Sequence, residues 1–290
     1  AHLLKYDSIY GTYAGEISAK DTILTVDGKD LPVFSEKEPN FLPWKKLGVD
    51  VVLECTGKFR TLEQAERHIT AGAKQVIISA PAEDGVPTVV KGVNTDHPTG
   101  SNVVSNASCT TNCISPIAAV LQDAFGVAKA VMTTIHAYTA DQALVDGPHK
   151  DLRRARAAGE NLVPTTTGAA LATTEVIPEL KGLFDGLSIR VPVSIVSLAD
   201  ITFVVKRKVT KQEVDDTFVK ASQSPRYKGI LEVTDLPLVS SDFKGNPASA
   251  VVDLSLTQVV DGDLVKIVAW YDNEWGYANR LVELAAVITG

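Results

Sequence analysis

The chain has 290 residues, of which 45% are hydrophobic and 22% charged, and its formal net charge is −7. These values predict a globular protein with a sizeable core in one large or two medium domains, and they favour neither a nucleic-acid nor a membrane partner. No apolar run approaches the ~18 residues that span a bilayer. The three cysteines exclude a disulfide scaffold and indicate a reducing, cytoplasmic location, and no Cys/His cluster has the spacing of a metal site.

The first residues, from Ala1 to Ser8, contain neither an initiator methionine nor a signal peptide and read like the interior of a domain. Residues 14–34 predict short polar strands with a turn at Asp27-Gly28, because apolar residues flank that dipeptide. A proline-containing connecting segment follows at 39–44.

Strands and a helix alternate over the next stretch. The expected elements are a strand at 49–55, a helix from Thr61 to Ala71, and strands at 75–79 and 103–105. The first strand is almost continuously apolar, as parallel strands covered on both faces are, so Cys55 is expected in the core. Thr61 and Gln64 have the spacing of a capping box. This alternation predicts a doubly wound, Rossmann-type parallel sheet.

Small polar residues follow three of these strands. In doubly wound sheets, ligands bind at the carboxyl ends of the strands. Thr56-Gly57, Ser79 and the segment 106–108 all stand at such ends, so we expect them to face one crevice. Ordinary turn chemistry is the alternative explanation for Thr56, Gly57 and Ser79.

Cys109 opens a helix directly after the strand at 103–105. The apolar face of that helix comprises Ile114, Ile117, Ala118, Leu121 and Phe125. Free backbone N–H groups and the helix dipole favour a thiolate at a helix start, and Ser108 and Thr110 can cap the turn or donate to an anion. Cys109 is therefore either a nucleophile or a small buried core residue, and its position alone leaves both interpretations open.

The second half of the chain is rich in strands. Strands are expected at 129–139, 187–195, 196–208, 229–234, 249–258 and 263–271, a polar loop at 141–164, and helices from 168 to 176, from 210 to 222 and over the final residues. Thr210 and Glu213 form a second capping box. Successive strands with few helices predict a largely antiparallel second domain, so the fold class is α/β plus α+β.

His136 lies at the end of a predicted strand. It would be a natural base for Cys109 if the fold brings the two together, because a Cys–His pair lowers the pKa of the thiol and relays protons. A hydrogen-bonded core histidine is the alternative. The other histidines, His2, His68, His97 and His149, are expected at the surface.

Two positively charged features indicate anion binding. Arg190 interrupts the apolar run 187–193, where a charge is costly unless it is paired or faces a cleft, and an anionic ligand would provide that partner. The Thr165–Gly168 stretch precedes a helix, as an anion-binding loop or a simple N-cap would. The basic run 153–156 is either a solvated or intersubunit segment or part of such a site.

Several motifs together resemble the glyceraldehyde-3-phosphate dehydrogenase family, and they occur in the same order. They are Ser105-Asn106-Ala107-Ser108-Cys109-Thr110-Thr111-Asn112-Cys113, Thr134-Ile135-His136-Ala137-Tyr138-Thr139, Asp151-Leu152-Arg153-Arg154, Pro164-Thr165-Thr166-Thr167-Gly168, Arg190-Val191-Pro192 and Trp270-Tyr271-Asp272-Asn273-Glu274. The resemblance covers essentially the whole chain. It implies the phosphorylating oxidation of glyceraldehyde 3-phosphate to 1,3-bisphosphoglycerate in glycolysis, with reduction of NAD, through a hemithioacetal and a thioester.

The resemblance also implies a role for each site residue. Cys109 is the nucleophile and His136 its base. The substrate phosphate is expected at Thr139, Asp141 and Arg190, and inorganic phosphate at Ser108, Thr110, Arg154, Thr167 and Gly168. Asn273 matches the residue that binds the nicotinamide carboxamide, and the other cofactor positions are Thr56, Gly57, Phe59 and Ser79. Gly147-Pro148 favours NAD over NADP, because NAD-specific members usually have this proline.

The family pattern implies two domains and an assembly. Residues 1–108 with 273–290 are expected to form the NAD-binding domain and residues 109–272 the catalytic domain, with the last helix returning to the first domain. A strand and a Gly-rich phosphate loop that precede this segment in the family are not in the chain, so the Rossmann sheet is expected to be incomplete. A homotetramer is expected, with 141–164 as its intersubunit loop.

Three other functions remain as alternatives. A related enzyme would oxidise another phosphorylated aldehyde, such as erythrose 4-phosphate. A Cys–His hydrolase or acyltransferase would need no nucleotide. The missing phosphate loop also permits a non-catalytic interaction protein.

Overall fold

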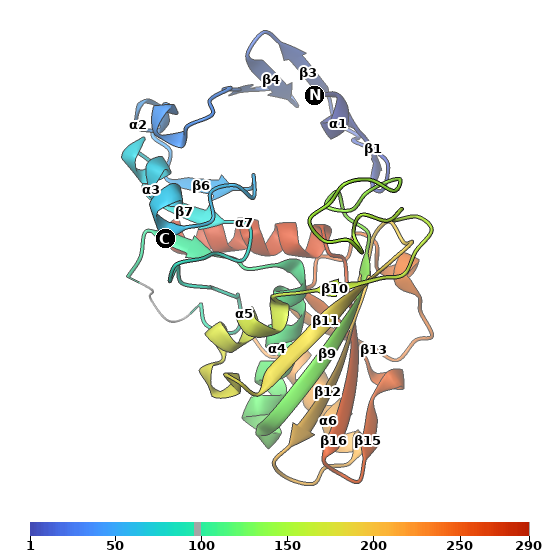
Figure 1. Cartoon of the computed structure of the whole chain (residues 1–290). Coiled ribbons are helices and arrows are strands. Elements are labelled where there is room, and N and C mark those ends of the chain that lie inside the picture. The colour runs from blue at the N-terminus through green and yellow to red at the C-terminus, as the bar shows by residue number, and fades with distance from the viewer. Residues whose placement is uncertain (96–99, 290) are drawn as a thin grey trace.

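The computed structural model describes residues 1–95 and 100–289 (Figure 1). The α-helices are α1 (His2–Lys5), α2 (Trp44–Leu47), α3 (Leu62–Thr70), α4 (Cys109–Phe125), α5 (Ala169–Val176), α6 (Lys211–Ser222) and α7 (Trp275–Thr289). The strands are β1 (Tyr6–Asp7), β2 (Gly11–Thr12), β3 (Ile17–Lys20), β4 (Ile23–Val26), β5 (Lys29–Pro32), β6 (Val51–Glu54), β7 (Gln75–Ile78), β8 (Val103–Ser105), β9 (Val127–Ala137), β10 (Val163–Thr166), β11 (Phe184–Val191), β12 (Ser197–Val205), β13 (Leu231–Thr234), β14 (Ala250–Asp253), β15 (Gln258–Val260) and β16 (Leu264–Tyr271). Short 3-10 helices are η1 (Pro39–Phe41), η2 (Pro178–Leu180), η3 (Ser240–Phe243) and η4 (Leu254–Leu256).

Strands β6, β7 and β8 form a parallel sheet in that order, with helices on both faces. Val76 and Ile78 of β7 pack in the same cluster as Ala65 of α3, whereas Ile77 packs with Leu281 of α7. Successive side chains of a strand point to opposite faces, so a strand that is covered on both faces is apolar throughout. The predicted parallel Rossmann-type sheet is confirmed, and the predicted capping box of Thr61 and Gln64 begins α3.

A larger mixed sheet follows, in the order β10-β11-β9-β12-β16-β14-β13, with β15 on β16. Most of its pairs are antiparallel, but β11 runs parallel to β9 and β13 parallel to β14. One face buries Ile201, Phe203 and Ile267 against helices that include α4 and α6. The largely antiparallel second sheet is therefore as predicted. Along β12, buried and half-buried residues alternate, which is the pattern of a sheet covered on one face only.

Helix α7 lies between the two sheets (Figure 1). Leu281 and Leu284 pack with Ile77 and Val104 of the parallel sheet. On the other side, the buried Arg280 donates from Nη1 to the carbonyl oxygen of Gly229, at 2.7 Å, just before β13. The last helix thus contacts both halves of the fold.

The N-terminal residues form two small sheets, β1-β2 and β3-β4-β5, above the rest of the molecule (Figure 1). The predicted turn at Asp27-Gly28 joins β4 to β5, and both of its residues have positive φ, 49° and 77°. Such a turn matches the twist of a hairpin. The hydroxyl of Tyr10 reaches the turn between β16 and α7, where it donates to the carboxylate of Asp272 at 2.8 Å.

Several local predictions are wrong. Cys55 is exposed rather than in the core, because it shares a face of the β6 strand with Leu53, which is also exposed. His68 is buried, because it lies three residues after the buried Ala65 on the same face of α3. His149 is half-buried, and His97 lies outside the described residues.

Strand boundaries differ from the expected ones in the second half. The polar loop expected to reach 164 ends in β10, and the strand expected at 187–195 is β11, which begins at Phe184 and ends at Val191. The expected strand 249–258 is interrupted by η4. The positions at which these strands begin and end are determined by the strands they pair with rather than by the periodicity of their own residues.

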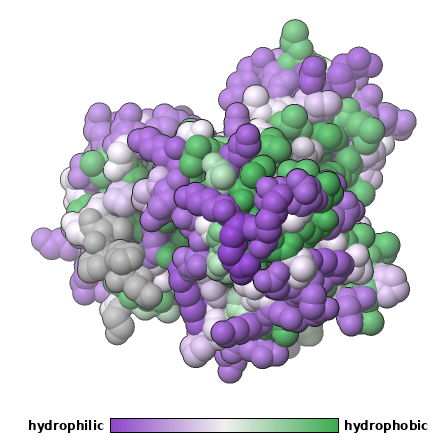
Figure 2. Space-filling model, turned by 90° about the horizontal axis from the view of Figure 1, so that it is seen from below, coloured by the Kyte–Doolittle hydropathy of each residue, from purple (hydrophilic) through white to green (hydrophobic). Residues whose placement is uncertain are grey.

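The surface is mostly hydrophilic with local apolar areas. Figure 2 shows, from below, apolar side chains gathered in one part of the surface between hydrophilic borders. Among the helices of the described residues, none is both long and apolar enough to cross a membrane.

Candidate active site

The turn between β8 and α4 presents Cys109 at the first position of the helix. Ala107 has a φ of +54°, a left-handed conformation that alanine rarely adopts, and it is buried. Ser108 is the N-cap, since its Oγ accepts the N–H of Thr111 at 3.1 Å. This sharp reversal directs the side chain of Cys109 away from the parallel sheet and towards the mixed sheet.

Cys109 and His136 meet at the end of β9. The Sγ atom of Cys109 lies 3.5 Å from Nε2 of His136. On the other side of the ring, Nδ1 lies 2.7 Å from the carbonyl oxygen of Ala137. A nitrogen this close to a carbonyl carries the hydrogen, so Nε2 presents its lone pair to the sulfur. This is the arrangement of a nucleophile and its general base.

Burial governs the charge states of this pair. Burial, together with the positive charge of Arg190, lowers the pKa of His136 from 6.5 to about 4, although the hydrogen bond to Ala137 acts to raise it. Burial also raises the pKa of the Cys109 thiol, whereas the Thr110 hydroxyl and Arg190 act to lower it. His136 is therefore neutral at pH 7, as a base must be before it accepts a proton.

Arg190 stands next to His136 across the parallel pair of β11 and β9. Its Nη1 lies 3.2 Å from the carbonyl oxygen of Ala137, 3.2 Å from Oγ1 of Thr139 and 3.1 Å from Nδ1 of His136. Its Nε is buried and makes no hydrogen bond. Within the described chain no carboxylate forms an ion pair with Arg190, so this partly buried cation has room for an anion.

Tyr271 contacts several residues around Cys109 and His136. Its hydroxyl lies 2.8 Å from Oγ1 of Thr110 and 2.8 Å from Oγ1 of Thr134, so three hydroxyls form a buried chain. Thr110 in turn lies next to the Cys109 sulfur, at 3.9 Å. The Tyr271 ring also meets the ring of His136 edge to face, with centroids 6.0 Å apart. Tyr271 thus contacts residues on both α4 and β9.

Arg154 belongs to a neighbouring polar cluster. It pairs with the carboxylate of Asp141, and its Nε donates to Oγ1 of Thr165 at 3.0 Å. Asp141 thus faces Arg154 and, at 3.5 Å, His149 rather than Arg190. Burial would raise the pKa of Asp141, but the guanidinium of Arg154 outweighs this and lowers it.

Thr167 and Gly168 precede α5, where Gly168 is the exposed N-cap. The Thr167 hydroxyl accepts the N–H of Ala169 at 3.2 Å. Neither residue makes a hydrogen bond to Ser108 or Thr110 among the described residues. Helices α4 and α5 are nonetheless in contact, since the hydroxyls of Ser115 and Thr173 lie 3.0 Å apart.

Four residues predicted for the cofactor lie at ends of the parallel strands. Thr56 and Gly57 follow β6, Ser79 follows β7, and Phe59 lies two residues after Gly57. Gly57 has a φ of +70° and open space around it. The hydroxyl of Ser79 donates to the hydroxyl of Tyr277 on α7, at 3.1 Å.

Asn273 precedes α7 and is fixed by a second polar chain. The N–H of Ala137 donates to Ser197 Oγ at 3.1 Å, and that hydroxyl donates to Oδ1 of Asn273 at 3.0 Å. Within the described part of the chain no acceptor is found for the N–H donors of Asn273, so a ligand carbonyl could accept from them. An amide side chain linked through Ser197 to Ala137, next to His136, and a glycine turn at a strand end fit a dinucleotide.

Sequence reasoning assigned no role to Tyr271 or Ser197. Tyr271 ends β16 beside His136, and Ser197 begins β12 beside Asn273. A polar residue at a strand end is the sequence pattern that would have identified both. Sequence reasoning also assigned no functional role to Glu54 or His68. Within residues 1–95 and 100–289, no group of three His, Cys, Asp or Glu side chains is arranged to hold a metal ion.

Comparisons with known proteins agree with this geometry. Residues 108–273 match the model of the glyceraldehyde 3-phosphate dehydrogenase C-terminal domain, and residues 1–62 match that of its NAD-binding domain. Glyceraldehyde-3-phosphate dehydrogenase from Streptomyces coelicolor is 54% identical over 290 residues, which cover 99% of this chain and 86% of that protein. Glyceraldehyde-3-phosphate dehydrogenase 1 from Bacillus cereus is 51% identical, with 100% and 87% covered, and the enzyme from Geobacillus stearothermophilus is 50% identical, with 99% and 86% covered. The chain belongs to the glyceraldehyde-3-phosphate dehydrogenase family.

Proposed function

We propose that Cys109 and His136 carry out the reaction of this chain, which is the oxidation of glyceraldehyde 3-phosphate in glycolysis with NAD as cofactor. The observation that carries the assignment is the 3.5 Å approach of Sγ to a lone pair of Nε2, in a ring whose other nitrogen is held by Ala137. The sequence left Cys109 open as a core thiol and His136 as a core histidine, and their mutual approach favours the reactive interpretation of both.

The proposed mechanism begins when His136 takes the thiol proton, the sulfur attacks the aldehyde carbon, and His136 returns that proton to the resulting alkoxide, which gives a hemithioacetal and a neutral His136. His136 then accepts the hydroxyl proton while the carbon loses a hydride, which leaves a thioester on Cys109. NAD supplies the hydride acceptor when it is bound. Inorganic phosphate attacks the thioester, the C–S bond breaks, and 1,3-bisphosphoglycerate leaves as the thiolate of Cys109 is restored.

We assign the substrate phosphate to Arg190, Thr139 and Asp141. The unpaired guanidinium of Arg190, with Thr139 at 3.2 Å, supports this assignment. Asp141 is included for its contact with Arg154, because a carboxylate repels a phosphate directly and acts here by orienting the neighbouring cation.

We assign inorganic phosphate to a second pocket on the two helix starts. Its residues are Ser108, Thr110, Arg154, Thr167 and Gly168. The N-termini of α4 and α5 and the guanidinium of Arg154 supply positive charge for an anion that attacks the thioester.

We assign the cofactor to Thr56, Gly57, Phe59, Ser79 and Asn273. The strand ends of the parallel sheet and the free N–H donors of Asn273 support this set. The corresponding domain assignment gives residues 1–108 and 273–290 to the cofactor and 109–272 to catalysis, which the packing of α7 on β7 and β8 supports.

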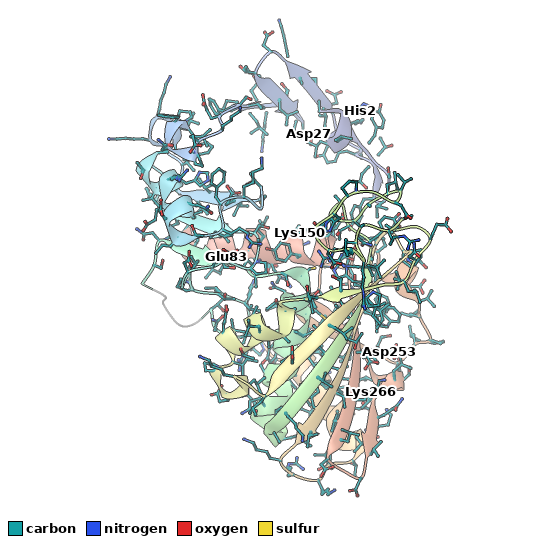
Figure 3. The ribbon with its side chains drawn as sticks, in the orientation of Figure 1. His2, Asp27, Glu83, Lys150, Asp253 and Lys266 are labelled. Carbon is teal, nitrogen blue, oxygen red and sulfur yellow. The ribbon has the colours of Figure 1, made fainter. Side chains whose placement is uncertain are left out.

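We further propose a cytoplasmic homotetramer. Val131 and Leu187 are 57% and 44% exposed on the outward face of the mixed sheet, and Leu144 and Leu152 of the 141–162 loop are more than 80% exposed. Figure 3 shows Lys150 in this loop at the upper end of the mixed sheet. Exposed apolar residues of this kind favour burial between subunits. Sedimentation equilibrium measures the assembly, and a monomer at micromolar concentration would contradict it.

The activity is tested by NADH formation from glyceraldehyde 3-phosphate with and without inorganic phosphate. We expect turnover to need phosphate and Cys109, so that Cys109→Ser abolishes it. Faster turnover of erythrose 4-phosphate than of glyceraldehyde 3-phosphate would instead favour the related enzyme. Hydrolase and non-catalytic alternatives have no support from the family assignment.

A further inference from the structure

A buried hydrogen-bonded chain lies behind the predicted cofactor residues of β6. Glu54 and His68 are each 4% exposed, and Nε2 of His68 lies 3.1 Å from Oε2 of Glu54. The indole N–H of Trp44 donates to Nδ1 of His68 at 3.1 Å. Because Trp44 can only donate, Nδ1 is the acceptor nitrogen and the Nε2 hydrogen points to Glu54.

The second oxygen of Glu54 holds the turn that follows β6. Oε1 accepts the backbone N–H of Thr56 at 2.8 Å and also the Thr56 hydroxyl. The Thr56 Oγ1 in turn accepts the N–H of Lys58 at 3.2 Å. Burial would raise the pKa of Glu54, but the hydrogen bonds from His68 and Thr56 outweigh it and hold the pKa below its usual range. Both carboxylate oxygens are thus occupied within the protein.

The same imidazole also contacts Phe59. The two rings meet edge to face with centroids 6.2 Å apart, while Trp44 stacks on His68 at 6.3 Å. One buried histidine therefore contacts Phe59 directly and Thr56 through Glu54. These are two of the five residues assigned above to the cofactor, and a buried ionised carboxylate is costly unless hydrogen bonds such as these compensate it.

We propose that His68 and Glu54 are positioning residues that hold the Thr56–Phe59 segment in the conformation that binds the adenosine part of NAD. Strand β6 is separated from β8, which leads to Cys109, by β7. Two strand spacings amount to about 10 Å, so this segment meets the half of the dinucleotide remote from the reacting carbon. The inference rests on the proposed cofactor role of Thr56 and Phe59.

The test measures binding of NAD and of ADP-ribose, which lacks the nicotinamide ring, to the full chain. His68→Leu removes the donor to Glu54, and we expect both dissociation constants to rise about tenfold. The KM for glyceraldehyde 3-phosphate and the rate at which iodoacetamide alkylates Cys109 without NAD should stay within twofold. A protein that is less stable but binds ADP-ribose like the wild type would overturn the proposal.

Milder variants guard against loss of folding. His68→Gln retains an N–H towards Glu54 and should recover most of the affinity, whereas Trp44→Phe removes only the donor to Nδ1 and should weaken binding less than His68→Leu. Arg67→Ala, on an exposed residue of α3, and His2→Gln are the matched controls and should bind normally. Figure 3 shows His2 on the N-terminal segment, away from the β6–β8 sheet.

Thr56→Ala and Phe59→Ala separate this inference from the cofactor assignment. If neither variant weakens ADP-ribose binding, the assignment of Thr56 and Phe59 itself fails. If they weaken it but His68→Leu and Glu54→Gln do not, only the positioning role of the buried pair is wrong.

Discussion

The Sγ atom of Cys109 and the Nε2 atom of His136 lie 3.5 Å apart, although one residue opens α4 after the parallel sheet and the other lies near the end of β9 in the mixed sheet. Among residues 1–95 and 100–289, the hydrogen-bond partners of these two side chains include no second group that could accept the thiol proton. The pair therefore depends on the packing of α4 against the mixed sheet, and its chemistry can be tested one group at a time.

Replacing His136 by asparagine removes the base but keeps a small polar side chain. We expect kcat to fall by about 10²- to 10⁴-fold, because that is the usual contribution of general-base catalysis, while the KM for NAD changes little. Steady-state kinetics measure both constants. Cys113→Ala is a control variant in the same helix as Cys109. Because Cys113 is fully buried in α4, this variant should keep most of its activity.

Replacing Arg190 by leucine removes the cation that favours the Cys109 thiolate. A lost positive charge raises a thiol pKa, so the pH profile of Cys109 alkylation by iodoacetamide should move to higher pH. Arg156→Leu removes an exposed arginine that pairs with Asp146, and its profile should match that of the wild type. An unshifted Arg190→Leu profile would mean that Arg190 has no influence on the thiol.

Tyr271→Phe breaks the hydroxyl chain between Thr110 and Thr134, both of which are buried. We expect a loss of about 1–3 kcal/mol in the free energy of unfolding, because buried hydroxyls are left without partners. Tyr227→Phe is the control, since the Tyr227 hydroxyl is buried without a hydrogen bond and its removal should cost little. Equal effects of the two substitutions in urea denaturation would contradict the structural role of Tyr271.

The buried His136 predicts a loss of stability in acid. Its pKa is 6.5 when unfolded and about 4 in the folded chain, so the unfolded state binds more protons between these values. Folding is therefore free of this penalty above pH 6.5, and stability falls as the pH drops from 6.5 towards 4, by up to about 3 kcal/mol. Urea midpoints measured across this range should fall more steeply for the wild type than for His136→Asn. Parallel slopes would exclude His136 as a source of the acid sensitivity.

Local sequence patterns predicted the helices and strands that are determined mainly by residues close together in the chain. The capping boxes of Thr61 and Thr210 begin α3 and α6 where the spacing placed them, and the apolar run of β7 became a strand with both faces covered. Strand β10 was not predicted, and the boundaries of β11 were missed, because pairing with neighbouring strands determines where these strands lie.

The sequence predicted which residues form the site, but it did not predict the distances between them. Helix and strand patterns place Cys109 and His136 at element ends, yet only the packing of α4 on the mixed sheet brings them together. His68 was expected at the surface, although its spacing from Ala65 places it on the buried side of α3. Asp141 was grouped with Arg190, and only the fold of the loop shows that it faces Arg154.

The position of α7 has a consequence for synthesis on the ribosome. Ile77 and Val104 belong to a sheet that is translated well before Leu281 and Leu284, which cover one of its faces. While some 170 residues are being added after β8, one face of that sheet is exposed to water or to a chaperone. The parallel sheet therefore reaches its native packing only after α7 has been translated.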